Sequence, residues 1–374
     1  MPYDSIVVPK NASIKVFLGP VQDFQTSLVL LNSIDKLPGM NPSIMEINRS
    51  MTAEERLNNR IIVHGLHYCF FSVEYWSGVP EFISHLSGLQ PEVFKERLFQ
   101  RYADRILIRK YDGNPGLEKP ETIDLEKVLK TEGSFLEFIR DNFEIRHADF
   151  ETEALSYQYL VDPPKLKSFI ISHLKTMWEK YLSREWERNK PLLEESVSAF
   201  QKLDLTSMDR FEAVKTVTNQ DVLDEWQEWP WKVEWLRQVC CVLLTPSPFI
   251  GPYVVKYIAD NTFHISYGAR LPEGIQAVTS DLNRNDLNVR LNALADDTRL
   301  KMIQLIAEQG ELSSQEIMNQ LELSQSATSR HLKQLSATGF LKERRQTSAK
   351  VYEINEEFAE KTIGALAGFL QKQN

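Results

Sequence analysis

The chain has 374 residues and a formal net charge of −9, with 42% hydrophobic and 25% charged residues, a composition typical of soluble globular proteins. It has no apolar run of 18 residues that would cross a membrane, and its first residues lack the basic and apolar segments of a secretory signal. Three cysteines, two of them adjacent, do not form a disulfide framework, so we expect a cytoplasmic protein of two or three domains without membrane contact.

The first 270 residues have strand-like patterns at both ends and helical patterns between them. Near the N-terminus, the apolar segments Ala12–Leu18 and Gln25–Leu31 flank Gly19-Pro20, which predicts a hairpin. A capping box at Thr52–Glu55 opens the first of many helices, which continue to about residue 216. Strand patterns return at Val239–Leu244, Val254–Ile258 and Thr262–Tyr267, the last two joined by a two-residue turn. We therefore predict a mostly helical α+β domain over residues 1–270, with a small sheet built from both its ends.

A sector rich in tryptophan lies late in this region. Trp226, Trp229 and Trp231 are dense enough to be candidate ligand-binding residues, because aromatic side chains line many small-molecule pockets. Aromatic residues also fill helical cores, and that alternative stays open. The cluster His64, His67 and Cys69 has no second ligand pair at a diagnostic spacing, so we expect no metal site. Phosphate-binding loops and catalytic motifs are absent from the sequence, which predicts neither a cofactor nor an enzyme.

Residues 271–285 contain Pro272, Gly274 and few large apolar residues, and predict a linker to a C-terminal domain at 286–374. Residues 281–374 hold 12 basic and 13 acidic residues, whereas the rest of the chain holds 31 and 39, a net charge of −8. Such an acidic N-terminal domain would repel DNA. We therefore interpret it as a sensor, a dimer scaffold or both, and not as an auxiliary DNA-binding surface.

The C-terminal segment has the order of elements found in a winged helix-turn-helix. Asp296 stands at the N-cap position of a helix that Gly310 ends, and Ser313 with Glu316 forms a capping box for a second helix. After the short turn Glu322-Leu323, Ser324 caps a third helix that runs to about Thr338. This order places the third helix in a DNA major groove.

The third helix and the hairpin after it carry side chains suited to DNA. Gln325, Ser326, Ser329 and Arg330 can donate to or accept from base edges. Two strands, Phe340–Arg345 and Lys350–Ile354, surround the tip Gln346–Ala349 and predict a basic wing. Residues 324–350 carry six basic residues and one acidic residue, net +5. The predicted DNA-binding residues are Ser324, Gln325, Ser326, Thr328, Ser329, Arg330, His331, Lys333, Lys342, Arg344, Arg345 and Lys350.

Three stretches of this segment resemble the ArsR family of winged-helix regulators. They are its opening, 293–300 (ALADDTRL), its recognition helix, 323–335 (LSQSATSRHLKQL), and the entry to its wing at Gly339-Phe340-Leu341. The resemblance covers about residues 286–370 and implies a homodimeric regulator of bacterial type that binds double-stranded DNA, more often a repressor than an activator. Two features depart from the family: Ser314–Leu321 lacks the Cys-x-Cys of many metal sensors, and the wing tip lacks its usual glycine.

A last helix, Glu356–Gln371, has an apolar stripe through Phe358, Thr362, Leu366 and Phe369. Little remains in a short winged domain to cover this stripe, so we predict that it forms a dimer seam. The alternative is packing against the N-terminal region of the same chain.

The sequence thus predicts a DNA-binding transcriptional regulator, a homodimer that is controlled through its N-terminal domain by a small-molecule effector. Two alternatives remain at this point: the winged helix serves as a protein-interaction module, or the N-terminal domain is a passive scaffold for a DNA-binding protein. A steep salt dependence of DNA binding would argue against the first alternative. Stabilisation of the folded chain by a small molecule would argue against the second.

Overall fold

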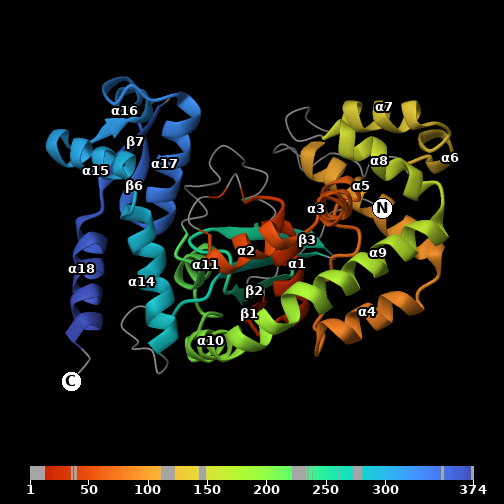
Figure 1. Cartoon of the computed structure of the whole chain (residues 1–374), viewed down its shortest axis with the longest axis horizontal. Helices are drawn as coiled ribbons and strands as arrows, with labels where there is room; N and C mark the ends of the chain where they lie inside the picture. Colours follow the sequence, from red (N-terminus) through yellow and green to blue (C-terminus); the bar gives the residue numbers. More distant parts are fainter. Residues whose placement is uncertain are drawn as a thin grey trace.

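The computed structural model describes residues 13–34, 37, 40–110, 123–142, 149–220, 233, 236–237, 239–259, 261–272, 280–346 and 349–371. Figure 1 shows a C-terminal winged domain at the left, a sheet with its helices in the middle and a helical region at the right. The sheet and the helical region belong to the N-terminal part of the chain, so the α+β prediction with a C-terminal winged helix-turn-helix is confirmed. Within the described ranges, no helix is long and apolar enough to cross a bilayer.

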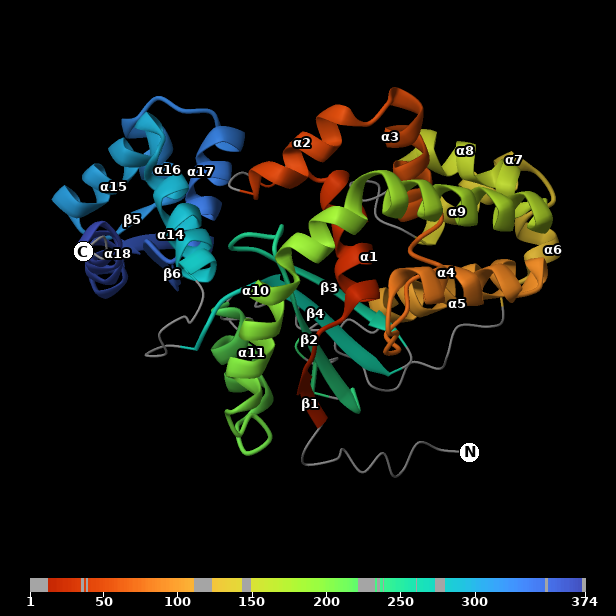
Figure 2. The same ribbon diagram turned by 60° about the horizontal axis from the view of Figure 1, so that its bottom comes forward.

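The sheet of the N-terminal domain joins strands from both ends of that domain, as predicted. Its order is β1-β2-β4-β3, and its first three members, β1 (Ser13–Val16), β2 (Cys241–Ser247) and β4 (Thr262–Gly268), run parallel. The edge strand β3 (Val254–Ala259) runs antiparallel to β4. Helix α1 (Pro20–Leu31) packs on one face, and α10 (Ser183–Gln201) and α11 (Arg210–Thr218) cover the other (Figure 2).

The predicted N-terminal hairpin is wrong, because residues 25–31 belong to α1 and not to a strand. Pro20 occupies the first turn of α1, where its missing N–H costs nothing. All residues of α1 except Val29 are buried. The helix therefore lacks the exposed polar face that gives a surface helix its 3.6-residue pattern in the sequence. The preceding Gly19 is needed for close packing, since a Cβ there would lie 2.6 Å from Gln22 Oε1 and 2.9 Å from Thr245 Cγ2.

The helical region lies between α1 and α10 in the chain. The predicted capping box at Thr52 and Glu55 is present at the start of α3, and a π-helical turn, η3, joins α9 to α10. Its elements are α2 (Pro42–Ser50), α3 (Ala53–Arg60), η1 (Ile61–Gly65), α4 (Val79–Gly88), α5 (Pro91–Lys110), α6 (Leu125–Val128), α7 (Glu132–Asn142), α8 (Phe150–Leu160), α9 (Pro163–Met177) and η3 (Trp178–Leu182). Together they form the larger of the two apolar cores of the N-terminal domain.

A buried polar layer separates α1 from the sheet. Thr26 Oγ1 lies 2.6 Å from Ser266 Oγ, and Thr245 Oγ1 lies 2.8 Å from His264 Nε2. Asp23, at the start of α1, is 3% exposed, and its Oδ1 has no hydrogen-bond partner among the described residues. Burial raises the pKa of Asp23 from 3.8 to about 7, although a hydrogen bond from Ser247 opposes the rise. The folded chain therefore favours a neutral Asp23.

We expect Asp23→Asn to stabilise the protein at pH 8 and to leave its stability nearly unchanged near pH 4. A carboxyl group whose pKa is raised by folding contributes its full stability below pH 3.8 and loses it as the pH rises to about 7. The loss amounts to at most about 4 kcal/mol, and the Asn variant escapes it. Urea unfolding of both chains at the two pH values measures the difference. Equal destabilisation of the Asn variant at both values would contradict the raised pKa.

The winged domain starts earlier than predicted. Helix α14 (Ser280–Leu294) begins inside the range 271–285 that we expected to be a linker, and it packs on α15, α17 and α18. The remaining elements are α15 (Asp297–Gln309), β5 (Leu312–Ser313), α16 (Ser314–Gln320), α17 (Gln325–Thr338), β6 (Leu341–Gln346), β7 (Ala349–Ile354) and α18 (Glu356–Gln371). They enclose a separate apolar core.

The predicted helix ends of the winged domain are present. The side chains of Asp296 and Ser324 accept hydrogen bonds from backbone N–H groups in the first turns of α15 and α17, and Ser313 forms its capping box with Glu316. Gly339 ends α17 with φ of 92°, and a Cβ there would lie 3.1 Å from the Phe358 ring. These local signals fix the length and direction of α17.

The wing is a tight hairpin. Strands β6 and β7 stay paired out to Gln346 and Ala349, so only two residues connect them, although the expected glycine is absent. Residues 347–348 lie outside the described part of the chain. The short strand β5 pairs with β7 and completes a three-stranded sheet that the sequence pattern did not predict.

Candidate nucleic-acid interface

The polar face of α17 is exposed over its first two turns. Gln325, Ser326, Ser329 and Arg330 are all exposed, and Lys333 follows them one turn later. Ser324 Oγ accepts from Ala327 N at 3.2 Å, which leaves other backbone N–H groups of the first turn open to an acceptor. A helix end of this kind can approach a phosphate while its side chains contact base edges.

Two predicted contact residues face the interior. Thr328 is 2% exposed, and its hydroxyl donates to Ser324 O at 3.0 Å. His331 is 9% exposed, and its Nδ1 lies 3.8 Å from Asp296 Oδ1. Burial lowers the pKa of His331, so its ring adds no dependable positive charge at neutral pH. We therefore remove Thr328 and His331 from the DNA-contacting set.

A buried arginine, Arg299, joins α14 to the start of α15 beside α17. Arg299 donates through Nε to Ala293 O at 2.5 Å and through Nη2 to Asn292 O at 2.8 Å, while Nη1 lies 3.6 Å from Asp296 Oδ2. Burial by itself would raise the pKa of Asp296. The hydrogen bond from the Arg299 N–H and the positive charge of its guanidinium have the larger combined effect, so the pKa of this carboxyl is lowered. This cluster joins the end of α14 to the start of α15, and Asp296 links both to His331 of α17.

The cations of the wing are mostly paired with acidic residues of the same domain. Arg344 forms an ion pair with Glu311, and Lys350 Nζ lies 2.6 Å from Glu343 Oε1. In the described ranges, no carboxylate pairs with Arg330, Lys333 or Lys342. Exposed ion pairs contribute only about 0–1 kcal/mol, so Arg344 and Lys350 can exchange their carboxylates for phosphates. The side chain of Arg345 lies outside the described set.

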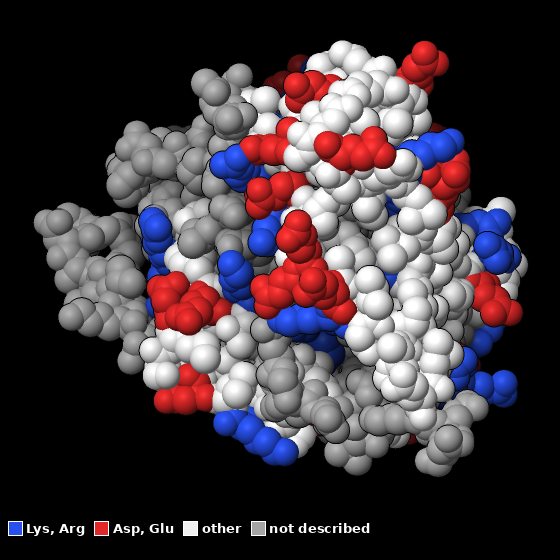
Figure 3. Space-filling view, turned by 90° about the vertical axis from the view of Figure 1, so that its left-hand side faces the viewer, with Lys and Arg blue, Asp and Glu red and all other residues white. Residues whose placement is uncertain are grey.

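The last helix, α18, packs on the winged domain along its first half, where Thr362 is buried. Phe358 packs edge-on against Phe340 at 5.3 Å, and Thr362 Oγ1 accepts from Arg290 Nη1 at 3.4 Å. Beyond them, Ile363 and Leu370 are 69% and 68% exposed. Figure 1 places α18 on the side of the winged domain away from the N-terminal domain, so the alternative of intrachain packing there is not observed. Figure 3 views that side and shows an uncharged strip beside scattered charged residues.

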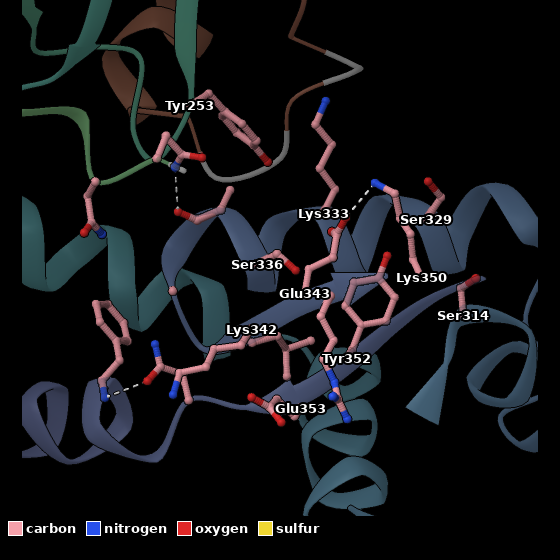
Figure 4. A pocket seen from close by; sticks show the side chains of 18 of the residues that line it. Tyr253, Ser314, Ser329, Lys333, Ser336, Lys342, Glu343, Lys350, Tyr352 and Glu353 are labelled. Carbon is pink, nitrogen blue, oxygen red and sulfur yellow. Dashed lines mark hydrogen bonds and ion pairs between the residues drawn. The ribbon is translucent and has the colours of Figure 1, made fainter. Parts of the chain in front are cut away.

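The outer face of α17 forms one side of a groove of about 1210 Å³ between the two domains. Figure 4 shows Lys333 rising from α17 toward Tyr253 of the N-terminal domain, with Lys342 and Tyr352 of the wing on the other side. Lys333 Nζ lies 5.7 Å from the centre of the Tyr253 ring. The sequence analysis missed the contribution of the N-terminal domain to this groove, because its lining residues precede the first residue of α17, Gln325, by 69 positions or more and leave no local signal.

The predicted ligand-binding residues Trp226, Trp229 and Trp231 lie outside the described residues. Across the described ranges, no group of three or more His, Cys, Asp or Glu side chains could hold a metal ion. Cys69 is buried, and burial raises the pKa of its thiol to about 12, which makes it a poor thiolate ligand.

Comparison with known proteins agrees with the winged-helix geometry. Residues 296–343 match the family model described as bacterial regulatory protein, arsR family. Arsenic resistance transcriptional regulator ArsR1 of Pseudomonas putida is 44% identical over 75 residues, which are 20% of this chain and 59% of that protein. ArsR2 of the same organism is 45% identical over 65 residues, 17% of this chain and 56% of that protein.

The C-terminal region of the chain therefore carries an ArsR-family helix-turn-helix domain. The chain spans less than two thirds of the length of these curated relatives, and the match leaves the large N-terminal domain uncovered. The expected resemblance is thus confirmed for the segment that carries α15, α16, α17 and the start of the wing.

Proposed function

We propose that this protein is a transcriptional regulator that binds double-stranded DNA through its winged domain. The exposed polar face of α17, beside a basic wing, is the observation that carries the proposal. Gln325, Ser326, Ser329 and Arg330 contact base edges in the major groove. Phosphates are contacted by Ser324, Lys333, Lys342, Arg344, Arg345 and Lys350.

The protein acts as a homodimer joined through the second half of α18. Ile363, Phe369 and Leu370 are exposed there, and the helix also carries small residues that allow close approach of a second copy. A dimer presents two recognition helices about one turn of DNA apart, which lets it bind two half-sites together. One short helix by itself makes too few base contacts for a specific site.

Repression is the mode of regulation that the family resemblance favours. The winged domain, residues 280–374, contains no cysteine, so it lacks thiolates for sensing arsenic or another soft metal. We infer that the signal is a small-molecule effector of the N-terminal domain, that the protein has no catalytic role, and that it works in the bacterial cytoplasm with its DNA. Stabilisation of the folded chain by a compound in a thermal-shift screen would identify the effector.

The salt dependence of duplex binding tests the proposed function. If the five proposed cations of each protomer contact phosphates, a dimer has a slope of log K against log [salt] of about −9. Fluorescence anisotropy with a labelled duplex of mixed sequence measures this slope. Failure to bind the duplex at low salt, or a slope near zero, would instead favour a winged helix that contacts another protein.

A further inference from the structure

The wall of the groove opposite the wing belongs to the N-terminal domain. Its lining side chains come from the end of α11 and from β3 with the loop before it, and the polar ones are Lys215, Asn219, Gln220, Tyr253 and Lys256. Each of these side chains can donate a hydrogen bond, and no carboxylate occurs among the described residues that this domain contributes to the groove. This is the reverse of the acidic balance of the domain as a whole.

Direct contacts hold this wall against α17. Gln220 Nε2 donates to Pro252 O at 2.8 Å within the N-terminal domain and to Ala337 O at 3.2 Å in α17. Tyr253 is 7% exposed and lies under the ammonium group of Lys333. Lys215 and Lys256 therefore share one groove with Lys333 and Lys342, although they come from the other domain.

We propose that the N-terminal domain contacts the phosphates of the same DNA duplex that α17 reads, through Lys215 and Lys256. This inference rests on the proposed function. The wall adjoins the C-terminal half of α17, whereas bases are contacted from the N-terminal half of a recognition helix. The backbone that borders the major groove is then the part of the duplex that comes nearest to the wall. Cations and amides are the groups that contact phosphates there.

The contacts between the wall and α17 disfavour the opposite role, in which the N-terminal domain masks α17. Gln220 and Tyr253 touch α17 at Ala337 and Lys333, in its C-terminal half, and not at the residues that read bases. Gln325, Ser329 and Arg330 also remain exposed beside the wall. On this proposal the basic surface extends beyond the winged domain, whereas the acidic balance of the N-terminal domain led us to expect that it takes no part in DNA binding.

The test compares the full-length chain with its double variant Lys215→Gln/Lys256→Gln, which keeps the length of both side chains and removes both charges. We expect binding to a labelled mixed-sequence duplex at low salt to weaken at least about ten-fold, and the slope of log K against log [salt] to fall in magnitude by about 2 per protomer. Lys127→Gln/Lys130→Gln is the matched control. It removes two exposed charges, one on α6 and one just after it, at the far end of the molecule (Figure 1), and it should leave the slope unchanged. Circular dichroism and thermal melts confirm that all the chains are folded.

An unchanged slope in the Lys215→Gln/Lys256→Gln variant would overturn the inference, and so would tighter binding, which would show that the wall masks α17. Lys342→Gln, measured in parallel, separates this failure from that of the proposed function. If Lys342→Gln lowers the slope while the double variant does not, the winged domain binds DNA without help from the N-terminal domain. If the unaltered chain does not bind the duplex, the proposed function itself fails.

Discussion

Arg330→Ala is expected to abolish selective DNA binding while leaving most non-specific binding intact. Arg330 is exposed on the second turn of α17, and no carboxylate in the described ranges pairs with it. An arginine that forks onto a guanine contributes about 1–3 kcal/mol of discrimination, so the variant should lose about 5- to 150-fold in affinity per half-site for the preferred sequence. Anisotropy titrations with the preferred duplex and a mixed-sequence duplex give both affinities.

Lys301→Ala is the control for this prediction, because Lys301 is an exposed cation on α15 that pairs with Asp297 at 2.7 Å, away from the groove. Lys301→Ala changes the charge of the domain by the same amount as Arg330→Ala. It should preserve the ratio of the affinities for the preferred and the mixed-sequence duplex. If Arg330→Ala instead keeps the full preference for the selected sequence, α17 does not read bases through this residue.

Ile363→Asp/Leu370→Asp is expected to produce a folded monomer that no longer binds a two-fold symmetric site. Both side chains are about two thirds exposed in the single chain, so aspartate at these positions should be tolerated by the fold but not by an apolar seam. In a dimer, binding of one recognition helix holds the other at a high effective concentration near the second half-site. A monomer lacks this gain, so its affinity should fall more than about 100-fold. Light scattering after size exclusion gives the mass, and anisotropy gives the affinity.

The matched control places the same two negative charges elsewhere in the winged domain, as Gln304→Asp/Ala307→Asp on the exposed side of α15. This control should remain a dimer. A dimeric Ile363→Asp/Leu370→Asp chain would contradict the α18 seam. A monomeric chain that binds the symmetric site as tightly as the unaltered one would contradict the need for two recognition helices.

Most of the winged domain could be predicted from the sequence because its signals are local. Asp296, Ser313, Ser324 and Gly339 each act within a few residues, and each is found at the helix end that the pattern indicated. The burial of His331 was missed because it depends on Asp296, which lies 35 positions earlier and approaches it only in the folded domain. A polar residue on a helix can pack against the capping residue of a neighbouring helix instead of contacting DNA, and the periodicity of α17 alone does not separate these roles.

The N-terminal domain was less predictable because its sheet depends on distant pairings. β1 pairs with β2 in parallel, with Ser13 opposite Cys241, so the natural partner of the first strand lies more than 200 residues away. In the segment after Gly19 polar and apolar residues are buried alike, so no exposed polar face marks it in the sequence as the helix α1. The groove wall that contains Lys215 and Lys256 could not be predicted for the same reason, since no local pattern connects these residues to α17.

The central claim is that a dimer of this chain reads a DNA sequence with α17. The most direct test is selection of duplexes from a random-sequence pool by the full-length protein, followed by sequencing. We predict an inverted repeat whose half-site centres lie about one helical turn apart, near 34 Å, and whose enrichment is lost when the selection is repeated with Arg330→Ala. A pool that stays random with the unaltered chain, or the same repeat recovered with Arg330→Ala, would contradict the claim.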